Sequence, residues 1–233
     1  MFRFKQFSVD QSGCAMKINT DGVLLGAMAE AEQAKTILDI GTGTGVIALM
    51  LAQRYGDAII DAIEIDSSAA ATADRNFKNS IFHERLNIYR ADIFEFDEHV
   101  ERKYDLIVSN PPFYVDSLKS PGLKTNLAKH TDTAFLERLI SKISMSLSPP
   151  GKSWLVLPMS LRNRIIEYAE ENNIYVQDII EVRSYSESSP HRMILSLSAI
   201  NTLFVEGEII IYDSKGLYSE MYRSLLQPYF IAF

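Results

Sequence analysis

Residues Asn110-Pro111-Pro112-Phe113, with Tyr114 behind them, could hold an amine beside an aromatic plane. The Asn110 side-chain oxygen is one acceptor. The Pro111 carbonyl is a second, because each proline pushes the residue before it toward extended backbone and keeps that carbonyl out of a helix. Phe113 or Tyr114 offers a ring on which a heterocycle could stack. This set suits an exocyclic amino group, although the same residues are also typical of a plain turn with Phe113 in the core.

The element that positions this motif is a buried strand. Residues 106–108 are an apolar run, which favours a strand in the core. Two successive prolines cannot continue a central strand, because neither has an N–H for the ladder. The strand must therefore end at Asn110. The functional interpretation of the motif then depends on a reactive group bound next to it.

A glycine-rich turn earlier in the chain supplies such a site. Residues 36–40 read as a strand, Gly41-Thr42-Gly43-Thr44-Gly45 as the turn, and residues 46–55 as a helix with one apolar side. This order is typical of the start of a doubly wound nucleotide-binding sheet. A dinucleotide fingerprint needs its third glycine where Val46 stands. The spacing therefore fits NAD poorly and S-adenosyl-L-methionine (SAM) better.

Acidic residues follow the next two predicted strands. Glu64 lies near the end of strand 59–66, roughly twenty residues past the glycines, where a carboxylate would accept ribose hydroxyls. Asp66 is less favoured there and is expected to cap helix 67–79. A third strand, residues 86–93, brings Asp92 to the same sheet edge. Its carboxylate would accept a hydrogen bond there from the adenine amino group of a cofactor. The competing interpretation of Asp92 is a surface loop residue.

The N-terminal 30 residues allow two interpretations, a cap over one face of the domain or an arm that touches substrate. Arg3 and Lys5 are either solvated charges or RNA contacts. Thr20 or Asp21 is expected to cap a short helix over the apolar residues that follow.

The second half of the chain is expected to complete the sheet. Residues 115–132 lack periodicity, and a structureless connection of this length is usually a functional lid or disordered. Because the segment is basic in an acidic protein, it is either an RNA contact or simply solvated. We expect an amphipathic helix at 133–148, ended by the prolines at 149–150. A strand at 153–157 follows, then a helix at 161–172 capped by Ser160. Strands 179–183 and 193–199 form an antiparallel pair. Residues 200–233 add one strand and a short aromatic helix.

The motifs together resemble a known family. Asp39-Ile40-Gly41-Thr42-Gly43-Thr44-Gly45, Glu64, Asp92 and Asn110-Pro111-Pro112-Phe113, in this order, are similar to the class I SAM-dependent methyltransferases with an Asn-Pro-Pro-aromatic motif. Phe7, the segment from Met16 to Gly26, and the C-terminal Ile209-Ile210-Ile211-Tyr212-Asp213, Tyr218 to Tyr222 and Pro228-Tyr229-Phe230 extend the resemblance to the bacterial valine-tRNA adenine-N6 methyltransferases.

This resemblance implies an α/β, Rossmann-like fold with a seven-stranded, mostly parallel sheet in the order 3-2-1-4-5-7-6 and helices on both faces. It implies methylation of the adenine immediately 3′ of the anticodon in valine tRNA. We expect one methyltransferase domain, with residues 1–30 as the cap, 31–199 as the catalytic core and 200–233 as an extension. The resemblance implies these SAM-binding residues: Asp39, Gly41, Thr42, Gly43, Gly45, Glu64, Asp92 and Asn110. The catalytic set is Asn110, Pro111, Pro112, Phe113 and Tyr114.

Composition limits how RNA can be held. The chain has 233 residues, 47% of them apolar, and a formal charge of −7, with a pI of about 5.2. This is the wrong overall sign for a protein that coats nucleic acid, so tRNA must be gripped locally. The candidate contacts are Lys119, Lys124, Lys129, His130, Arg3 and Lys5.

Other partners and activities are less favoured. The four histidines lack neighbours at metal-ligand spacing, so we expect no metal. No signal peptide or bilayer-length apolar run is present, and the single cysteine excludes an internal disulfide. We therefore expect a cytoplasmic monomer. The alternatives are methylation of guanine N2 in RNA or of a protein glutamine, a non-catalytic SAM- and RNA-binding module, and a nicotinamide oxidoreductase.

Overall fold

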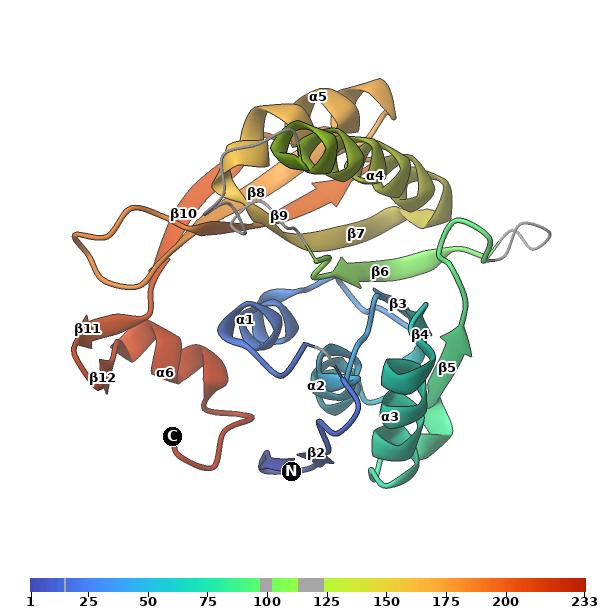
Figure 1. Cartoon of the computed structure of the whole chain (residues 1–233), viewed down its shortest axis with the longest axis vertical. Coiled ribbons are helices and arrows are strands. Elements are labelled where there is room, and N and C mark those ends of the chain that lie inside the picture. Colours follow the sequence, from blue (N-terminus) through green and yellow to red (C-terminus); the bar gives the residue numbers. More distant parts are fainter. Residues whose placement is uncertain (15, 97–101, 113–123) are drawn as a thin grey trace.

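The computed structural model describes residues 1–14, 16–96, 102–112 and 124–233, and only the backbone of 124–132. Eight strands form its central sheet in the order β10-β8-β9-β7-β6-β3-β4-β5 (Figure 1). Strand β9 is antiparallel to its two neighbours, β7 and β8, and all other neighbouring strands of this sheet are parallel. The strands are β3 (Thr36–Ile40), β4 (Ile59–Glu64), β5 (Leu86–Arg90), β6 (Tyr104–Ser109), β7 (Leu147–Pro158), β8 (Tyr175–Arg183), β9 (Arg192–Ser198) and β10 (Val205–Ile210).

Helices cover both faces of the sheet. Figure 1 shows α4 and α5 on one side and α1, α2 and α3 on the other. The helices are α1 (Thr20–Met28), α2 (Val46–Arg54), α3 (Ser67–Lys78), α4 (Lys124–Ser146), α5 (Arg162–Glu171) and α6 (Glu220–Leu226). Two short antiparallel pairs, β1 (Phe2–Arg3) with β2 (Ser8–Val9) and β11 (Tyr212–Ser214) with β12 (Leu217–Tyr218), lie outside the sheet.

Alternating side chains of the buried strands divide the core in two. Leu106 and Val108 of β6 belong to the cluster under α1 and α2, while Ile107 belongs to the cluster under α4 and α5. Successive strand residues point to opposite faces. A strand buried on both faces therefore reads as the continuous apolar run seen in the sequence.

The predicted strand order is confirmed, but the predicted number of strands is wrong by one. From β5 to β8 the order is that of the class I methyltransferase sheet, and β10 is added beyond it, parallel to β8. The strand expected in residues 200–233 is thus part of the main sheet. Its half-exposed, partly charged sequence, Val-Glu-Gly-Glu-Ile-Ile, is that of an edge strand.

Several helix boundaries differ from the prediction. Asn19 caps α1 through a hydrogen bond from the Gly22 amide, in place of Thr20 or Asp21. Asp66 caps α3 as predicted, accepting from the amides of Ser68 and Ala69. Ser160 caps nothing, because it lies inside a 3-10 turn, Met159–Leu161, that leads directly into α5.

The prediction of a structureless connection at residues 115–132 is wrong for residues 124–132, because α4 begins at Lys124. Residues 115–123 lie outside the described residues. The prediction that the prolines after α4 lie outside the following strand is also wrong. Pro149 and Pro150 belong to β7, where the register slips: Leu147 pairs with Tyr104, and the next pair is Lys152 with Leu106. Prolines are tolerated at such a bulge because residues there are not paired in the ladder, so the N–H that proline lacks is not needed.

Candidate active site

The glycine turn between β3 and α2 has two parts with different roles. Gly41, Gly43 and Gly45 all have positive φ, at 71°, 57° and 81°. A side chain on Gly41 or Gly43 would meet nothing within 4 Å, whereas one on Gly45 would come within 2.5 Å of the Phe77 ring. The first two glycines therefore keep an opening in front of the loop, and the third allows α3 to pack against it.

The Asp39 side chain holds the glycine turn in place through hydrogen bonds. Its Oδ2 accepts hydrogen bonds from the Thr42 hydroxyl at 2.6 Å and from the Ala48 amide at 3.2 Å. The side chain is fully buried, and its Oδ1 has no hydrogen-bond partner among the described residues. Burial raises the pKa of Asp39 to about 7. Asp39 and Thr42 thus fix the shape of the turn, and Asp39 has no exposed surface with which to touch a ligand.

Two carboxylates border the opening. Glu64 ends β4, and its Oε2 accepts from the Gly43 amide at 2.9 Å while Oε1 accepts from the Asp66 amide at 2.9 Å. Asp92 follows β5 and is partly exposed, and its Oδ1 accepts from the Phe94 amide at 2.9 Å. Glu64 is the last residue of β4, and Asp92 lies just past the end of β5. Both are therefore at the carboxyl ends of neighbouring strands, where ligands bind in sheets of this kind.

The register of the sheet brings Asn110 beside the glycine turn. Ile40, the last residue of β3, pairs with Ser109, the last residue of β6. Gly41 and Asn110 are the next residues, on strands that lie about 4.8 Å apart. The Ser109 hydroxyl also donates to the Ile40 carbonyl at 2.9 Å. The two predicted motifs therefore meet at one edge of the sheet.

The Asn110 side chain is partly exposed and faces the start of α1. A methyl carbon built on Gly22 would lie 3.7 Å from Asn110 Nδ2 and 3.9 Å from Ile47 Cδ1 of α2. The backbone turns out of the sheet at Asn110 as expected, with Pro111 buried and Pro112 exposed. Phe113, Tyr114 and Lys119 lie outside the described residues.

The first turn of α1 forms contacts that the sequence did not reveal. Asp21 Oδ2 forms an ion pair with Arg192 Nε at 3.4 Å, at the start of β9. Helix α1 also packs against α6, which carries Tyr222. No sequence pattern relates residues so far apart in the chain, although the position of Thr20 and Asp21 ahead of a short apolar helix did mark them as polar residues at its start.

The N-terminal segment is fastened over α3 and the glycine turn. Asn76, which is buried, accepts from the Asp10 amide at 2.8 Å and donates to the carbonyls of Asp10 and Thr44 at 2.9 and 2.8 Å. The Thr72 hydroxyl donates to the Ser12 carbonyl at 2.7 Å. Of the two interpretations of residues 1–30, these contacts favour a cap.

The basic residues predicted to touch RNA are only partly described. Lys5 donates through Nζ to the carbonyls of Gln227 and Phe233, at 2.5 and 3.0 Å, so it ties the two chain ends together. Arg3 is exposed on β1. Lys124, Lys129 and His130 lie in the part of α4 of which only the backbone is described.

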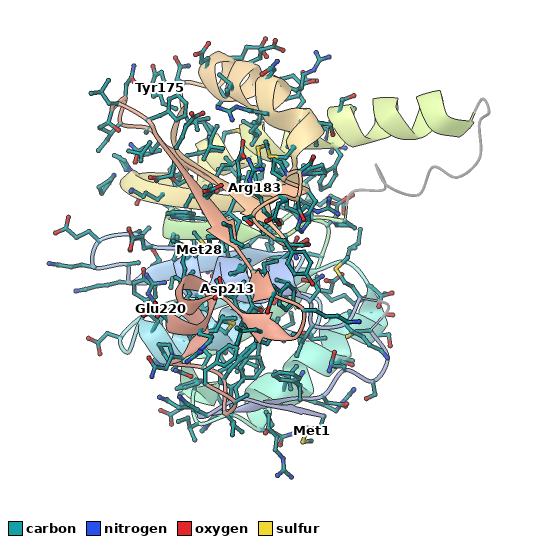
Figure 2. The ribbon with its side chains drawn as sticks, turned by 90° about the vertical axis from the view of Figure 1, so that its left-hand side faces the viewer. Met1, Met28, Tyr175, Arg183, Asp213 and Glu220 are labelled. Atoms are coloured by element: carbon teal, nitrogen blue, oxygen red, sulfur yellow. The ribbon has the colours of Figure 1, made fainter. Side chains whose placement is uncertain are left out.

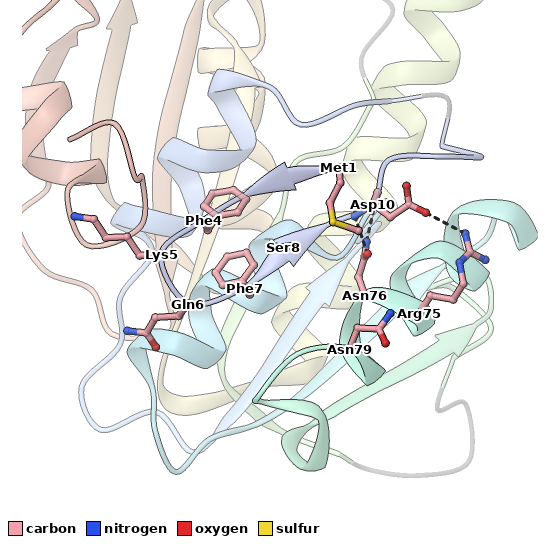
Figure 3. Close-up of a pocket in the computed structure, with 10 residues that line it drawn as sticks. All are labelled: Met1, Phe4, Lys5, Gln6, Phe7, Ser8, Asp10, Arg75, Asn76 and Asn79. Atoms are coloured by element: carbon pink, nitrogen blue, oxygen red, sulfur yellow. Dashed lines mark hydrogen bonds and ion pairs between the residues drawn. The ribbon is translucent and has the colours of Figure 1, made fainter.

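A pocket of about 450 Å³ lies between the N-terminal segment and α3 (Figure 3). Phe4 and Phe7 line one side, and Arg75, which pairs with Asp10 at 3.8 Å, lines the other. Lys5 points away from Arg75 in this view. The pocket shares no lining residue with the glycine turn or with Asn110.

The opening in front of the glycine turn fits SAM. Gly41 and Gly43 leave room for a ligand against the backbone. Glu64 and Asp92 supply acceptors for hydroxyl and amino groups, and their negative charges suit a ligand with a sulfonium and an ammonium group. The same charges would repel a pyrophosphate. Glu64 and Asp92 would hold such a ligand beside Gly41 and Gly43, and Asn110 borders the same opening.

The sequence and the fold are both similar to those of known methyltransferases. A family model described as Methyltransferase small domain matches residues 14–168. The fold resembles that of a predicted O-methyltransferase from Agrobacterium tumefaciens, with a TM-score of 0.69 at 16% identity over 90% of this chain and 96% of that one. The chain is therefore a methyltransferase of the small-domain class.

Two curated relatives define the family more narrowly. The chain is 44% identical over 232 residues to a tRNA1(Val) (adenine(37)-N6)-methyltransferase from Pedobacter heparinus, covering 100% of this chain and 98% of the relative. It is 42% identical to a protein of the same name from Parabacteroides distasonis, covering 99% and 97%. The chain belongs to the tRNA1(Val) (adenine(37)-N6)-methyltransferase family.

Within the described part of the chain, no three His, Cys, Asp or Glu residues gather as a metal ion would need, and no helix has the length and apolar character to span a bilayer.

Proposed function

We propose that this protein transfers a methyl group from SAM to N6 of adenine 37 in tRNA1(Val). The observation that carries the proposal is the meeting of Asn110 with the glycine turn at one sheet edge, in a chain that matches relatives of that name over its full length. In this proposal, SAM in front of the glycine turn and an amine held by Asn110 would be adjacent, as the transfer requires.

The methyl group of SAM is already activated by the adjacent sulfonium. What the protein must add is an aligned, electron-rich nitrogen, so position is most of the catalysis. Adenine N6 is a poor nucleophile because its lone pair is delocalised into the ring. Asn110 Oδ1 and the Pro111 carbonyl accept its two amino hydrogens in this proposal. The nitrogen then turns toward tetrahedral geometry, with its lone pair directed at the cofactor side.

The geometry of the Asn-Pro-Pro turn suits this role. Pro112 keeps Pro111 extended, which holds the Pro111 carbonyl away from any helical hydrogen bond. The Ser109 hydroxyl holds the preceding residue to β3, so Asn110 starts from a fixed point. Phe113 and Tyr114 remain our candidates for stacking on the base. After transfer the N6 proton is acidic enough to leave to water, and no general base is assigned.

The adenine must leave its neighbours to enter this site. Base-modifying enzymes extrude their target at a cost of a few kcal/mol, which is smaller in a single-stranded loop. An anticodon loop therefore suits the site. Because the chain carries a formal charge of −7, its grip on RNA must be local. Lys119, Lys124, Lys129, His130 and Arg3 remain the candidate contacts, while the two bonds from Lys5 to backbone carbonyls favour a structural role for it.

The experiment is methylation of an unmodified valine tRNA transcript by the purified protein with SAM, read by nucleoside mass spectrometry. We expect N6-methyladenosine in the wild-type transcript and none in a transcript with guanosine at position 37. A glutamine-containing protein substrate in parallel tests the protein alternative. Methylation of guanine, of another adenine or of the protein in preference to adenine 37 would overturn the proposal.

The RNA contacts can be tested separately. Replacing Lys124 and Lys129 together by Glu should weaken tRNA binding and flatten its dependence on salt, because fewer counterions are released. Lys35→Glu, at the opposite edge of the sheet before β3, is the matched control and should bind like the wild type. An unchanged salt slope in the double variant would move the RNA surface elsewhere.

A further inference from the structure

Four tyrosines form a continuous stack that the proposed chemistry does not use. Tyr185 lies 5.6 Å from Tyr212 between ring centroids, Tyr212 lies 4.9 Å from Tyr218, and Tyr218 lies 4.9 Å from Tyr222. The two inner pairs of rings are stacked, with interplanar angles of 25° and 13°, and Tyr185 is tilted by 33° against Tyr212. We call Tyr185, Tyr212, Tyr218 and Tyr222 the tyrosine stack.

The tyrosine stack lies beyond the carboxyl ends of the strands, on the same edge as Asn110. Tyr185 follows β8 by two residues and Tyr212 follows β10 by two, and both strands run in the direction of β6. Figure 2 shows Asp213 and Glu220 of this region beyond the Arg183 end of β8, with Tyr175 at the opposite end. Three strand spacings of about 4.8 Å separate β8 from β6, so the ends of these strands lie roughly 15 Å apart.

Helix α1 joins the stack to the catalytic motif. Helix α1 packs against α6, which carries Tyr222, the inner end of the stack. Gly22, in the first turn of α1, lies against the Asn110 side chain. Asp21, the residue before it, pairs with Arg192. Helix α1 therefore contacts both the helix that carries the inner end of the stack and the residue that is proposed to hold the target adenine.

The stack runs from the core toward solvent. Tyr222 is 4% exposed, while Tyr218, Tyr212 and Tyr185 are only partly buried. Tyr185 contacts one ring, Tyr212, among the described residues, so it is the outer end. The Ser184 carbonyl accepts from the Tyr212 amide at 3.0 Å, which fixes Tyr185 beside Tyr212.

A cation accompanies the rings. Lys215 lies in the exposed turn between β11 and β12, which carry Tyr212 and Tyr218. Partly exposed aromatic rings with a lysine in the turn that joins their strands are elements of single-strand recognition, in which rings receive bases and cations receive phosphates. A site that extrudes one base also leaves the neighbouring bases without a stacking partner.

We infer that the outer end of the tyrosine stack receives a base of the anticodon loop that flanks the extruded adenine, with Lys215 against the adjoining phosphate. The occupant is single-stranded RNA, because only unstacked bases can add to the end of a ring stack. The inference rests on the proposed function and extends it from the reacting base to its neighbours.

The test uses full-length protein and an unmodified valine tRNA transcript that carries 2-aminopurine beside adenine 37. Tyr185→Leu keeps side-chain bulk but removes the ring, and it should raise the tRNA Kd and KM by about tenfold, the scale of one base stack. It should also abolish the quenching of 2-aminopurine fluorescence that stacking causes. Tyr185→Phe should restore both, and SAM affinity should be unchanged in all variants.

Matched controls separate stacking from folding. Tyr175→Leu alters a partly buried tyrosine at the other end of β8 and should bind tRNA like the wild type. Lys215→Glu should weaken tRNA binding and reduce the salt slope by about one. If Tyr185→Leu fails to fold, this second variant decides the matter, because an unchanged salt slope would then overturn the inference.

The outcomes distinguish this inference from the proposed function. If the wild type methylates adenine 37 and Tyr185→Leu binds and quenches normally, the stack is structural and the inference alone fails. If Tyr185→Phe is as defective as Tyr185→Leu, the hydroxyl and not the ring is required, which also overturns it. If the wild type does not methylate adenine 37, the proposed function fails on that result alone.

Discussion

The Ser109 hydroxyl donates a 2.9 Å hydrogen bond to the carbonyl of Ile40, which joins the last residue of β6 to the last residue of β3. Ser109 is 1% exposed. Gly41 and Asn110, the next residue after each partner, therefore leave the sheet from a shared and buried anchor. We expect this bond to fix the distance between the opening in front of the glycine turn and Asn110, the proposed partner of the adenine amine.

Ser109→Ala should reduce the rate of methyl transfer by about tenfold and the free energy of unfolding by about 1 to 2 kcal/mol, because the Ile40 carbonyl loses a buried donor. SAM affinity should change little. Single-turnover methylation and urea denaturation measure the two effects. Ser153→Ala is the matched control: Ser153 is buried on the neighbouring strand, and its hydroxyl has no hydrogen-bond partner in the described structure. A comparable loss in that control would argue against the anchor.

The two kinds of glycine in the turn should respond differently to alanine. Gly41→Ala should cost about 1 to 2 kcal/mol for its positive φ and should weaken SAM binding, because the new methyl group projects into the opening. Gly45→Ala should cost more, by about 1 to 3 kcal/mol of overpacking in addition, because its methyl group would collide with Phe77. Denaturation curves and calorimetric titration with SAM compare them. Equal stability losses would refute the division of roles.

Asp39 should make the stability fall between acid and neutral pH. Burial raises its pKa to about 7, so the folded protein holds a proton that the unfolded chain releases above about pH 4. The free energy of unfolding from this group is therefore highest below pH 4 and declines, by up to about 1.4 kcal/mol per pH unit, until pH 7. Asp39→Asn should remove that slope. Thermal unfolding from pH 4 to 8 measures it, and an unaltered slope in the variant would count against the assignment.

Asp105 is a control of opposite sign. Burial raises the pKa of Asp105. Hydrogen bonds from the amides of Lys35 and Thr36 and from the hydroxyls of Ser148 and Thr36 lower the pKa by more, so that it lies below its ordinary value. Its contribution to stability is present above the unfolded pKa and is lost as the pH falls below about 4. Asp105→Asn should therefore alter only the acid limb of the same curve.

The sequence predicted the site better than it predicted the boundaries of the elements. The sequence predicted that Glu64 and Asp92 lie at one sheet edge, and they follow the neighbouring parallel strands β4 and β5 beside β3. The register of Ile40 with Ser109 places Asn110 beside Gly41 at the same edge. The roles of individual site residues stay predictions. Asp39 was expected to bind the cofactor, and this stays a prediction; its burial, which depends on tertiary packing, favours a role in supporting the turn.

Other features depend on contacts that no local pattern contains. The cap at Asn19 competed with Thr20 and Asp21, which have equally suitable side chains. Pro149 and Pro150 predicted a break, but the bulge opposite Tyr104 accommodates them within β7. The tyrosine stack joins residues from β11, β12, α6 and the loop after β8, and it therefore appears only once the chain has folded.

Asn76 should hold the N-terminal cap to the glycine turn. Asn76→Ala removes three hydrogen bonds and leaves buried backbone groups without partners, which should cost about 2 to 4 kcal/mol. The N-terminal segment should then become sensitive to protease before the rest of the chain unfolds. Asn79→Ala, exposed at the end of α3, should do neither. Unchanged protease resistance in Asn76→Ala would show that the cap is held by other contacts.

The most direct test of the account is Asn110→Ala, measured by single-turnover methylation of valine tRNA and by SAM binding in parallel. If Asn110 holds the adenine amine, SAM affinity should stay within a few fold of the wild type. Methyl transfer should fall by about 10² or more, because a preorganised hydrogen-bonding partner of the reacting group is lost. Near-normal turnover in this variant would contradict the proposal that Asn110 holds the adenine amine.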